Sequence, residues 1–275
     1  MNGVAQIQLG SFLLVYVLLL VVLAVMKKCR INQTKLLVLA SARMTLQLIA
    51  AGYALTFLFE HPHPLLTMGY LLILVFFTIY LVLSRNKRLN SRFRVIVSVS
   101  IASCGLGIIV FFVTCIVGQS VFDPQYLIPI SGMLMGNALT GVSLGLKSFW
   151  NGLEGQRARV EALLNIGATP EKVLFPFVCQ ALETALVPTL NSMLGMGIVV
   201  LPGMMTGQIL SGTAPTTAIL YQITIMVAIC ACVCLCCFCS LYFGYRTLWN
   251  AQKRVTFEQF HVEIALATAR AGTRI

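Results

Sequence analysis

Seven apolar stretches, separated by short polar segments, are the dominant pattern along the chain. Each is about 20 residues long, which is the length that an α-helix needs to cross the hydrocarbon core of a bilayer. The pattern therefore predicts an all-α polytopic membrane protein with seven transmembrane helices, at residues 4–26, 36–59, 65–83, 95–117, 126–146, 181–201 and 218–241. Because Lys27, Lys28 and Arg30 follow the first stretch, we expect it to be a membrane span and not a cleaved signal.

The composition supports a membrane location. Of the 275 residues, 59% are hydrophobic and only 10% are charged, and the mean hydropathy is +0.91. A soluble domain carries about 25% charged residues. Lipid is therefore expected to cover most of the surface. The net charge of +11 is interpreted as a sign of membrane orientation and not of nucleic-acid binding.

Positive charges are confined to alternate segments between the predicted helices. Apart from Arg43, every Lys and Arg follows the first, third, fifth or seventh helix. Because Lys and Arg concentrate in cytoplasmic loops, we expect the N-terminus outside and the C-terminus in the cytoplasm. The membrane is predicted to be the plasma (inner) membrane or an internal one.

The chain is predicted to comprise a seven-helix membrane domain, residues 1–250, and a cytoplasmic tail, residues 251–275. Within the membrane domain, residues 147–172 form the largest inner segment. In the tail, Phe257, Phe260 and Ile264 recur at helical spacing and predict a modest amphipathic helix.

The inner segment 147–172 predicts a short helix, a tight turn and a second helix. Its apolar residues recur at helical spacing, and Gly167 is suited to end the first helix in a left-handed conformation. Thr169 and Pro170 then suit the start of the next helix. Such an element can dock into a groove on a soluble partner. The alternative is a surface helix that lies on the lipid headgroups.

The segment from Glu161 to Gly167, EALLNIG, resembles the coupling loop of ABC transporter permeases, which seats in the ATPase subunit. A more specific resemblance is to the FetB-like iron-export permease family, whose plant relatives act in aluminium tolerance. It is carried, in the family's order, by RMTLQL at 43–48, IPISGM at 128–133, GNA at 136–138, GATP at 167–170, PTLNS at 188–192 and LPGMMTG at 201–207.

The resemblance implies a permease subunit that does not hydrolyse ATP. No Gly-x-x-x-x-Gly-Lys-Ser/Thr loop occurs in the sequence. No cofactor is expected in this chain, and ATP-Mg is expected at a separate cytoplasmic ATPase subunit. A homodimer with two such subunits is the expected assembly. The residues expected to couple it to the ATPase are Glu154, Arg157, Glu161, Ala162, Gly167 and Pro170.

Arg43 and Glu183 are the only charged side chains well inside predicted spans. A charge at the bilayer centre costs about 2.5–3.5 kcal/mol on insertion scales, so each is expected to face protein or water. We predict that the two side chains pair, or that both line an inner vestibule.

Uncharged polar residues and a helix break complete the candidate transport pathway. Buried amides either hydrogen-bond neighbouring helices or offer oxygen ligands. Pro202 is predicted to interrupt the sixth span and to form an outer gate. Met204 and Met205 are candidate soft-metal ligands, although methionine is also common apolar filler. The pathway candidates are Arg43, Gln47, Asn137, Glu183, Asn191, Pro202, Met204 and Met205.

Three further patterns have weaker functional interpretations. In span five, Gly132 and Gly136 fall on nearly the opposite face from Gly141 and Gly145, which predicts close helix packing on both sides. His61, His63 and Asp123 are metal-capable but typical of polar turns. The six cysteines between Cys230 and Cys239 either bind zinc or copper or act as small apolar residues.

The leading hypothesis is thus the permease subunit of an ABC transporter that exports metal ions, with iron as the expected cargo. A first alternative keeps the machinery but carries a sugar nucleotide or another organic anion, with Arg43 as the anion-facing group. A second alternative is a seven-helix receptor, and a third is a secondary transporter.

Overall fold

The computed structural model describes residues 9–31, 33–61 and 63–249. This part of the chain is almost entirely helical and contains no strand beyond one isolated bridge. The elements are α1 (Leu9–Lys28), α2 (Thr34–Glu60), α3 (Pro64–Arg85), α4 (Ser91–Phe111), the π-helical turn η1 (Phe112–Val117), α5 (Pro124–Gly155), α6 (Arg157–Asn165), α7 (Pro170–Gly195), α8 (Gly203–Leu210), α9 (Pro215–Gly244) and the 3-10 turn η2 (Tyr245–Leu248). The helix predicted at 255–275 lies outside the described residues.

Six helices in the described part are long and apolar enough to cross a membrane. They are α2, α3, α4 with η1, α5, α7 and α9, and they match the second to seventh predicted spans. The protein is therefore a multi-pass integral membrane protein. The first predicted span coincides with α1, a 20-residue helix; the count of seven spans and the orientation of the termini stay predictions.

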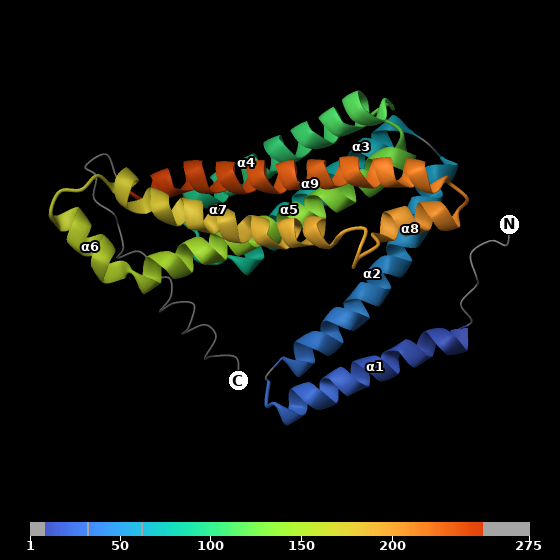
Figure 1. The fold of residues 1–275 in the computed structure, drawn as a ribbon, viewed down its shortest axis with the longest axis horizontal. Coiled ribbons are helices and arrows are strands. Elements are labelled where there is room, and N and C mark those ends of the chain that lie inside the picture. Colours follow the sequence, from blue (N-terminus) through green and yellow to red (C-terminus); the bar gives the residue numbers. More distant parts are fainter. Residues whose placement is uncertain (1–8, 32, 62, 250–275) are drawn as a thin grey trace.

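Helices α3, α4, α5, α7 and α9 form one bundle, with α5 and α9 at its centre (Figure 1). Core side chains recur along α5 at helical spacing, as Leu127, Leu134, Ala138, Val142 and Leu146 show. This periodicity gives α5 one continuous apolar stripe against its neighbours. The bundle therefore buries one side of α5 and leaves the other side free.

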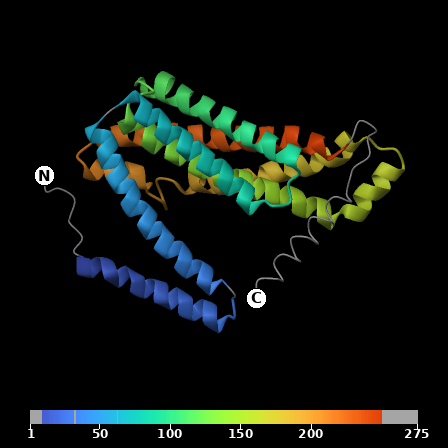
Figure 2. The same cartoon turned by 180° about the vertical axis from the view of Figure 1, so that it is seen from behind.

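The α1–α2 hairpin projects away from this bundle (Figures 1 and 2). Only Leu58 of α2 is buried, near the end where α2 joins α3. Tyr16 Oη and Thr45 Oγ1 are 2.7 Å apart and link the two helices of the hairpin. We call α1 and α2 together the arm.

The end of the sixth predicted span was wrong by six residues. Helix α7 ends at Gly195, and the chain then reverses through Gly197, which has φ +84°, with a bridge between Met196 and Val200. The residues of this reversal are apolar, so hydropathy alone extends the span past the true helix end. Pro202 does not interrupt a helix. It immediately precedes α8, which lies between the sixth and seventh predicted spans.

Helix α5 is longer than its predicted span, because it continues to Gly155. The first nine residues of the predicted inner segment, 147–155, are therefore helix and not loop. The bundle has two ends, which we name by the short helices they carry: the α6 end and the α8 end (Figure 1).

Candidate functional site

Helix α6 and the turn after it form an elbow between α5 and α7, residues 156–170. Gly167 has φ +90°, a left-handed conformation that favours glycine. Thr169 takes the N-cap position and Pro170 is the first residue of α7, although the Thr169 side chain makes no capping hydrogen bond. The predicted helix, turn and helix are confirmed at the predicted residues.

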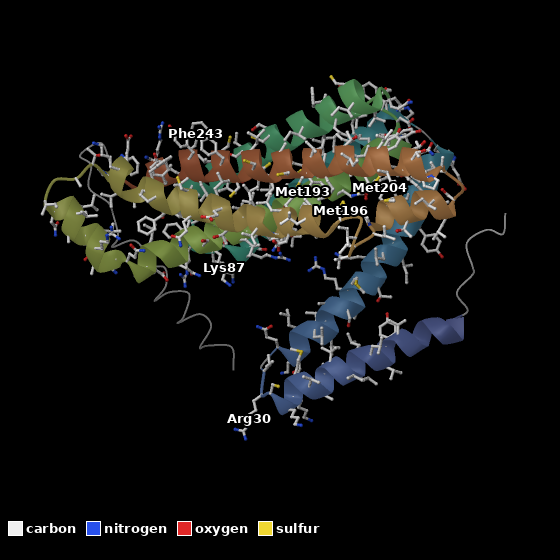
Figure 3. All side chains as sticks on the ribbon, viewed as in Figure 1. Arg30, Lys87, Met193, Met196, Met204 and Phe243 are labelled. Atoms are coloured by element: carbon white, nitrogen blue, oxygen red, sulfur yellow. The ribbon has the colours of Figure 1, made fainter. Side chains whose placement is uncertain are left out.

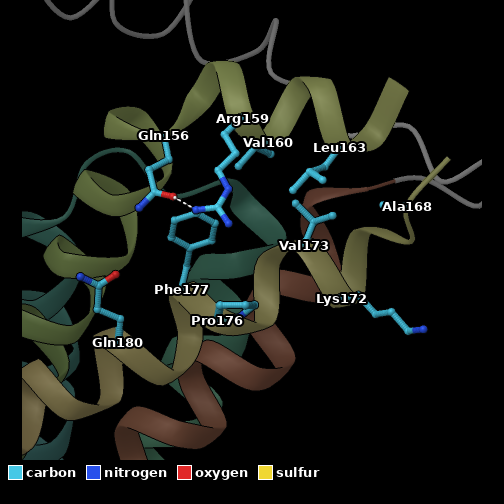
Figure 4. Close-up of a pocket in the computed structure, with 10 residues that line it drawn as sticks. All are labelled: Gln156, Arg159, Val160, Leu163, Ala168, Lys172, Val173, Pro176, Phe177 and Gln180. Carbon is cyan, nitrogen blue, oxygen red and sulfur yellow. Dashed lines mark hydrogen bonds between the residues drawn. The ribbon is translucent and has the colours of Figure 1, made fainter. Parts of the chain in front are cut away.

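The apolar side of α6 faces α7 and not the lipid headgroups. Val160 is buried, and Leu163 and Leu164 pack against the core cluster. Figure 4 shows Val160 and Leu163 directed toward Val173 of α7, across a small cavity of about 380 Å³. Arg159 Nη1 donates to Gln156 Oε1 across 3.3 Å at the mouth of that cavity. The elbow is therefore a packed unit attached to the bundle.

The face of α6 that points away from the bundle carries mostly small or apolar side chains. Ala158, Ala162, Asn165 and Ile166 are exposed, and Ile166 has 80% of its surface accessible. The Val160 face of α6 is used for packing within the chain and is not free to meet a partner. The exposed face, with Ala162 and Ile166, is the one available to a partner.

Two half-exposed ion pairs lie at and next to the elbow. Arg88 Nη1 lies 2.6 Å from Glu154 Oε1 and ties the end of α5 to the connection between α3 and α4. Arg157 Nε lies 2.6 Å from Glu161 Oε1, one helical turn further along α6. All four side chains are about half exposed, so each pair contributes only about 0–1 kcal/mol. Glu154, Arg157 and Glu161 thus have structural contacts within this chain.

The left-handed conformation at Gly167 leads to a testable prediction. A Cβ there meets open space, so G167A is expected to destabilise the elbow by about 1 kcal/mol through backbone strain alone. Hydrogen exchange of α6 amides measures the opening of the elbow. G155A is the matched control, because Gly155 also meets open space but has no positive φ. Equal exchange in the two variants would contradict the prediction.

The amides and the acid predicted to lie in the pathway are not buried in the bundle. Asn137 on α5 and Glu183 and Asn191 on α7 are all exposed, on the free sides of two helices that pack together. Ser148 Oγ and Thr184 Oγ1 are 3.0 Å apart across the same helix pair. We call the exposed sides of α5 and α7 the free face.

Arg43 and Glu183 do not form the predicted ion pair. Arg43 and Gln47 are exposed on the arm, and the Arg43 guanidinium carbon lies 5.9 Å from the centre of the Phe77 ring on α3. Within the described residues, neither Arg43 nor Glu183 contacts an opposite charge. The arm stands away from α7, so the pairing cannot form within this arrangement of the chain. The vestibule role of the two residues stays a prediction.

The two glycine pairs of α5 have different surroundings. A Cβ on Gly141 would overlap Val233 of α9, and one on Gly145 would lie 2.5 Å from Cys237 Sγ. Close packing is therefore confirmed for these two positions. Gly132 and Gly136 have nothing within 4 Å of an added Cβ and lie on the free face. No described part of this chain packs against this second pair, so close packing there stays a prediction for a neighbouring helix outside the chain.

Sequence reasoning missed a cationic pocket of about 520 Å³ between the end of α3 and the middle of α5. It is lined by Ser84, Arg85, Asn86, Lys87, Arg88, Ser143, Leu144, Lys147, Trp150 and Asn151. Lys87 is labelled in Figure 3, on the side of the bundle that faces the arm. In the sequence, the Lys and Arg residues of this pocket indicated only the orientation of the chain in the membrane. No local motif predicts that residues so far apart in sequence line one pocket.

The metal-capable side chains at the α8 end have structural roles. His63 Nδ1 accepts from the Leu65 amide at the start of α3, and Asp123 Oδ1 accepts from the Gln125 amide at the start of α5. Cys232 and Cys236 lie 4.0 Å apart between their sulfur atoms. Across the described ranges, no three His, Cys, Asp or Glu side chains gather as a metal site.

The predicted gate residues are separated in the structure. Met205 lines a cavity between α7, α8 and α9, whereas Met204 packs against the core cluster. Pro202 lies just outside α8. The metal hypothesis for this region therefore concerns Met205 and its neighbours, and not Met204.

Comparison with known proteins places these features in a family. The chain is 29% identical over 249 residues to the probable iron export permease protein FetB of Escherichia coli, covering 90% of this chain and 95% of FetB. It is 32% identical over 216 residues to ALUMINUM SENSITIVE 3 of Arabidopsis thaliana, covering 78% and 76% of the two chains. It is 30% identical over 217 residues to the membrane protein YjkA of Bacillus subtilis, covering 78% and 85%.

No solved structure matches the chain. The model of UPF0014, described as an uncharacterised protein family, matches residues 9–249, which includes the bundle, the arm and the elbow. The chain therefore belongs to the UPF0014 family of membrane proteins.

Proposed function

We propose that this chain is the permease subunit of an ATP-driven transporter of the ABC type, which works with a separate cytoplasmic ATPase and exports metal ions. The observation that carries the proposal is the elbow. A short helix packed on α7 presents a small exposed face, with Ala162 and Ile166, at one end of a long membrane helix. This is the helix-in-groove form that a soluble subunit recognises. The α6 end then faces the cytoplasm.

The working unit in this proposal is a homodimer. The free face exposes Asn137, Glu183 and Asn191 at membrane depth, and a charge facing lipid is costly. Gly132 and Gly136 on the same side of α5 allow another helix to approach closely. The arm, largely unburied, is available to pack on a second copy. Two free faces placed together would enclose a polar pathway.

Iron is the proposed cargo, because FetB carries the name of a probable iron export permease. The free face offers one carboxylate, Glu183, and two amide oxygens, from Asn137 and Asn191. Oxygen ligands suit hard metal ions. Duplication of these three groups in a dimer would double the number of ligands on the pathway.

A second candidate cargo is an organic anion such as a sugar nucleotide, and the cationic pocket favours it. Arg85, Lys87 and Lys147 line this pocket without an acidic neighbour among its lining residues, while Arg88 pairs with Glu154. Clustered positive charge concentrates anions and repels metal cations. A metal that enters at this end would therefore travel as an anionic complex.

The test is to reconstitute the chain with its candidate ATPase in vesicles and to measure ATP hydrolysis with iron, other metal ions and sugar nucleotides. Stimulation by iron supports the proposal. If sugar nucleotides alone stimulate ATP hydrolysis, the cargo is the second candidate, an organic anion. A chain that binds no ATPase would overturn the proposal and favour the receptor or secondary-transporter alternatives.

The cationic pocket yields a prediction that separates the two cargoes. If the cargo is an anion, the triple variant R85Q/K87Q/K147Q is expected to lose roughly ten-fold in cargo-stimulated hydrolysis, because the attraction toward the pocket is removed. If the cargo is a free metal cation, the same variant keeps or raises its stimulation. K27Q/K28Q/R30Q is the control, because it removes the same charge from the arm.

A further inference from the structure

A cavity of about 430 Å³ lies at the α8 end, where α7, the chain reversal, α8 and α9 meet. Four of its lining side chains are methionines, one from each of these segments. Figure 3 labels Met193 and Met196 at the end of α7, beside α9. The full lining is Met193, Met196, Gly197, Leu201, Met205, Ile219, Gln222, Ile223, Met226 and Val227.

Among the described residues that line this cavity, Gln222 has the one polar side chain, and it is only 6% exposed. Its Nε2 donates to Met196 Sδ across 3.7 Å, which fixes the direction of that thioether. Its Oε1 has no hydrogen-bond partner among the described residues. A buried amide oxygen without a partner is uncommon in proteins, and a bound water or ligand is one way to satisfy it.

The lining excludes most ligand classes. No charged side chain is among the described residues that line the cavity, so an anion or a hard cation finds no counter-charge or oxygen cluster among them. Met193, Met196, Met205 and Met226 line this cavity, and Met196 and Met226 also pack in or against the core cluster. Thioether sulfur is a soft ligand and suits Cu(I) and similar ions.

We propose that this cavity binds a soft monovalent cation, Cu(I) or Ag(I), through the sulfur atoms of Met193, Met196, Met205 and Met226. Gln222, whose side chain lines the same cavity, would supply a neutral oxygen. Binding would tie α8 and the reversal to α7 and α9. The proposal goes beyond the transport function, and it concerns binding to this chain alone.

The test uses the full chain, purified in detergent and labelled with selenomethionine, with one equivalent of Cu(I). X-ray absorption at the selenium edge reports only metal that is bonded to methionine, so the ten cysteines do not interfere. We expect a copper neighbour on selenium. Its absence, with copper on thiols alone, would overturn the proposal.

A pair of matched variants tests the position of the site. M193L/M196L/M205L/M226L keeps apolar side chains of similar size, and is expected to weaken Ag(I) binding by roughly ten-fold or more because thioether ligands are lost. M44L/M68L/M133L/M204L removes four methionines outside the cavity and is expected to bind like the parent. Unchanged binding in the first variant would contradict the assignment.

Unfolding curves without metal distinguish a lost site from a lost fold. Both quadruple variants are expected to unfold near the parent temperature, and only the parent and the control are expected to be stabilised by Ag(I). Since no ATPase is present, failure of this experiment leaves the proposed transport function untouched.

Discussion

Replacing Gly141 by Val is expected to destabilise the bundle by overpacking the contact between α5 and α9. The added Cβ would overlap Val233 of α9 and would lie 3.3 Å from the Ala185 carbonyl oxygen of α7. A side chain on either helix cannot move away freely, because both partners are central to the core. Overpacking of this kind costs about 1–3 kcal/mol and occasionally more. Thermal unfolding of the purified protein in detergent measures the loss.

The same substitution at Gly136 is the matched control for this prediction. Gly136 lies on the same helix, and nothing is within 4 Å of an added Cβ. G136V should unfold within about 0.5 kcal/mol of the parent, as surface substitutions usually do. In the proposed homodimer, G136V would instead weaken the association of two copies. If G141V and G136V lost equal stability, the packing described for α5 and α9 would be incorrect.

If the proposed ATPase subunit docks on the elbow, replacing Ile166 by Arg is expected to abolish coupling to it while leaving the fold intact. Ile166 is 80% exposed at the tip of the elbow, so its loss removes no core contact. An apolar side chain at the centre of a docking groove typically contributes about 2 kcal/mol or more, or roughly 30-fold in affinity. Co-purification with the ATPase and cargo-stimulated ATP hydrolysis are the measurements.

Ile198 provides the control for this second prediction. It is 91% exposed in the chain reversal at the opposite end of the bundle. I198R places the same charge on an equally exposed isoleucine, and we expect it to bind the ATPase like the parent. Loss of ATPase binding in both variants would show that the added charge has a general effect. Retained binding in I166R would contradict the assignment of the elbow as the docking face.

Features with a local cause were predictable from the sequence. The apolar length of six spans is set by the bilayer. The turn at Gly167 and the start of α7 at Pro170 follow from backbone conformations that those residue types favour. The elbow was therefore predicted at the residues where it occurs, although the exposure of Ile166 beside Ala162 was not predicted.

Features that depend on contacts between distant segments were not predictable. Apolar residues continue from α7 into the reversal, so only the fold shows that the helix ends at Gly195. The separation of Arg43 from Glu183 reflects the arm, which hydropathy does not reveal. The cationic pocket draws side chains from segments far apart in sequence, and the methionine cavity depends on how the chain folds back between residues 193 and 227.

Because α5 is longer than the bilayer is thick, a bend near one of its ends would move the other end through a large distance. Its 32 residues extend about 48 Å, at roughly 1.5 Å per residue, while the hydrocarbon core is only about 30 Å thick. Pro129 lies near its α8 end and is the natural position for a bend. A tilt of about 10° there would swing the far end, and α6 with it, through roughly 7 Å over the remaining helix. A small rotation within the membrane would thus be amplified into a displacement large enough for spin labels on two elbows to record.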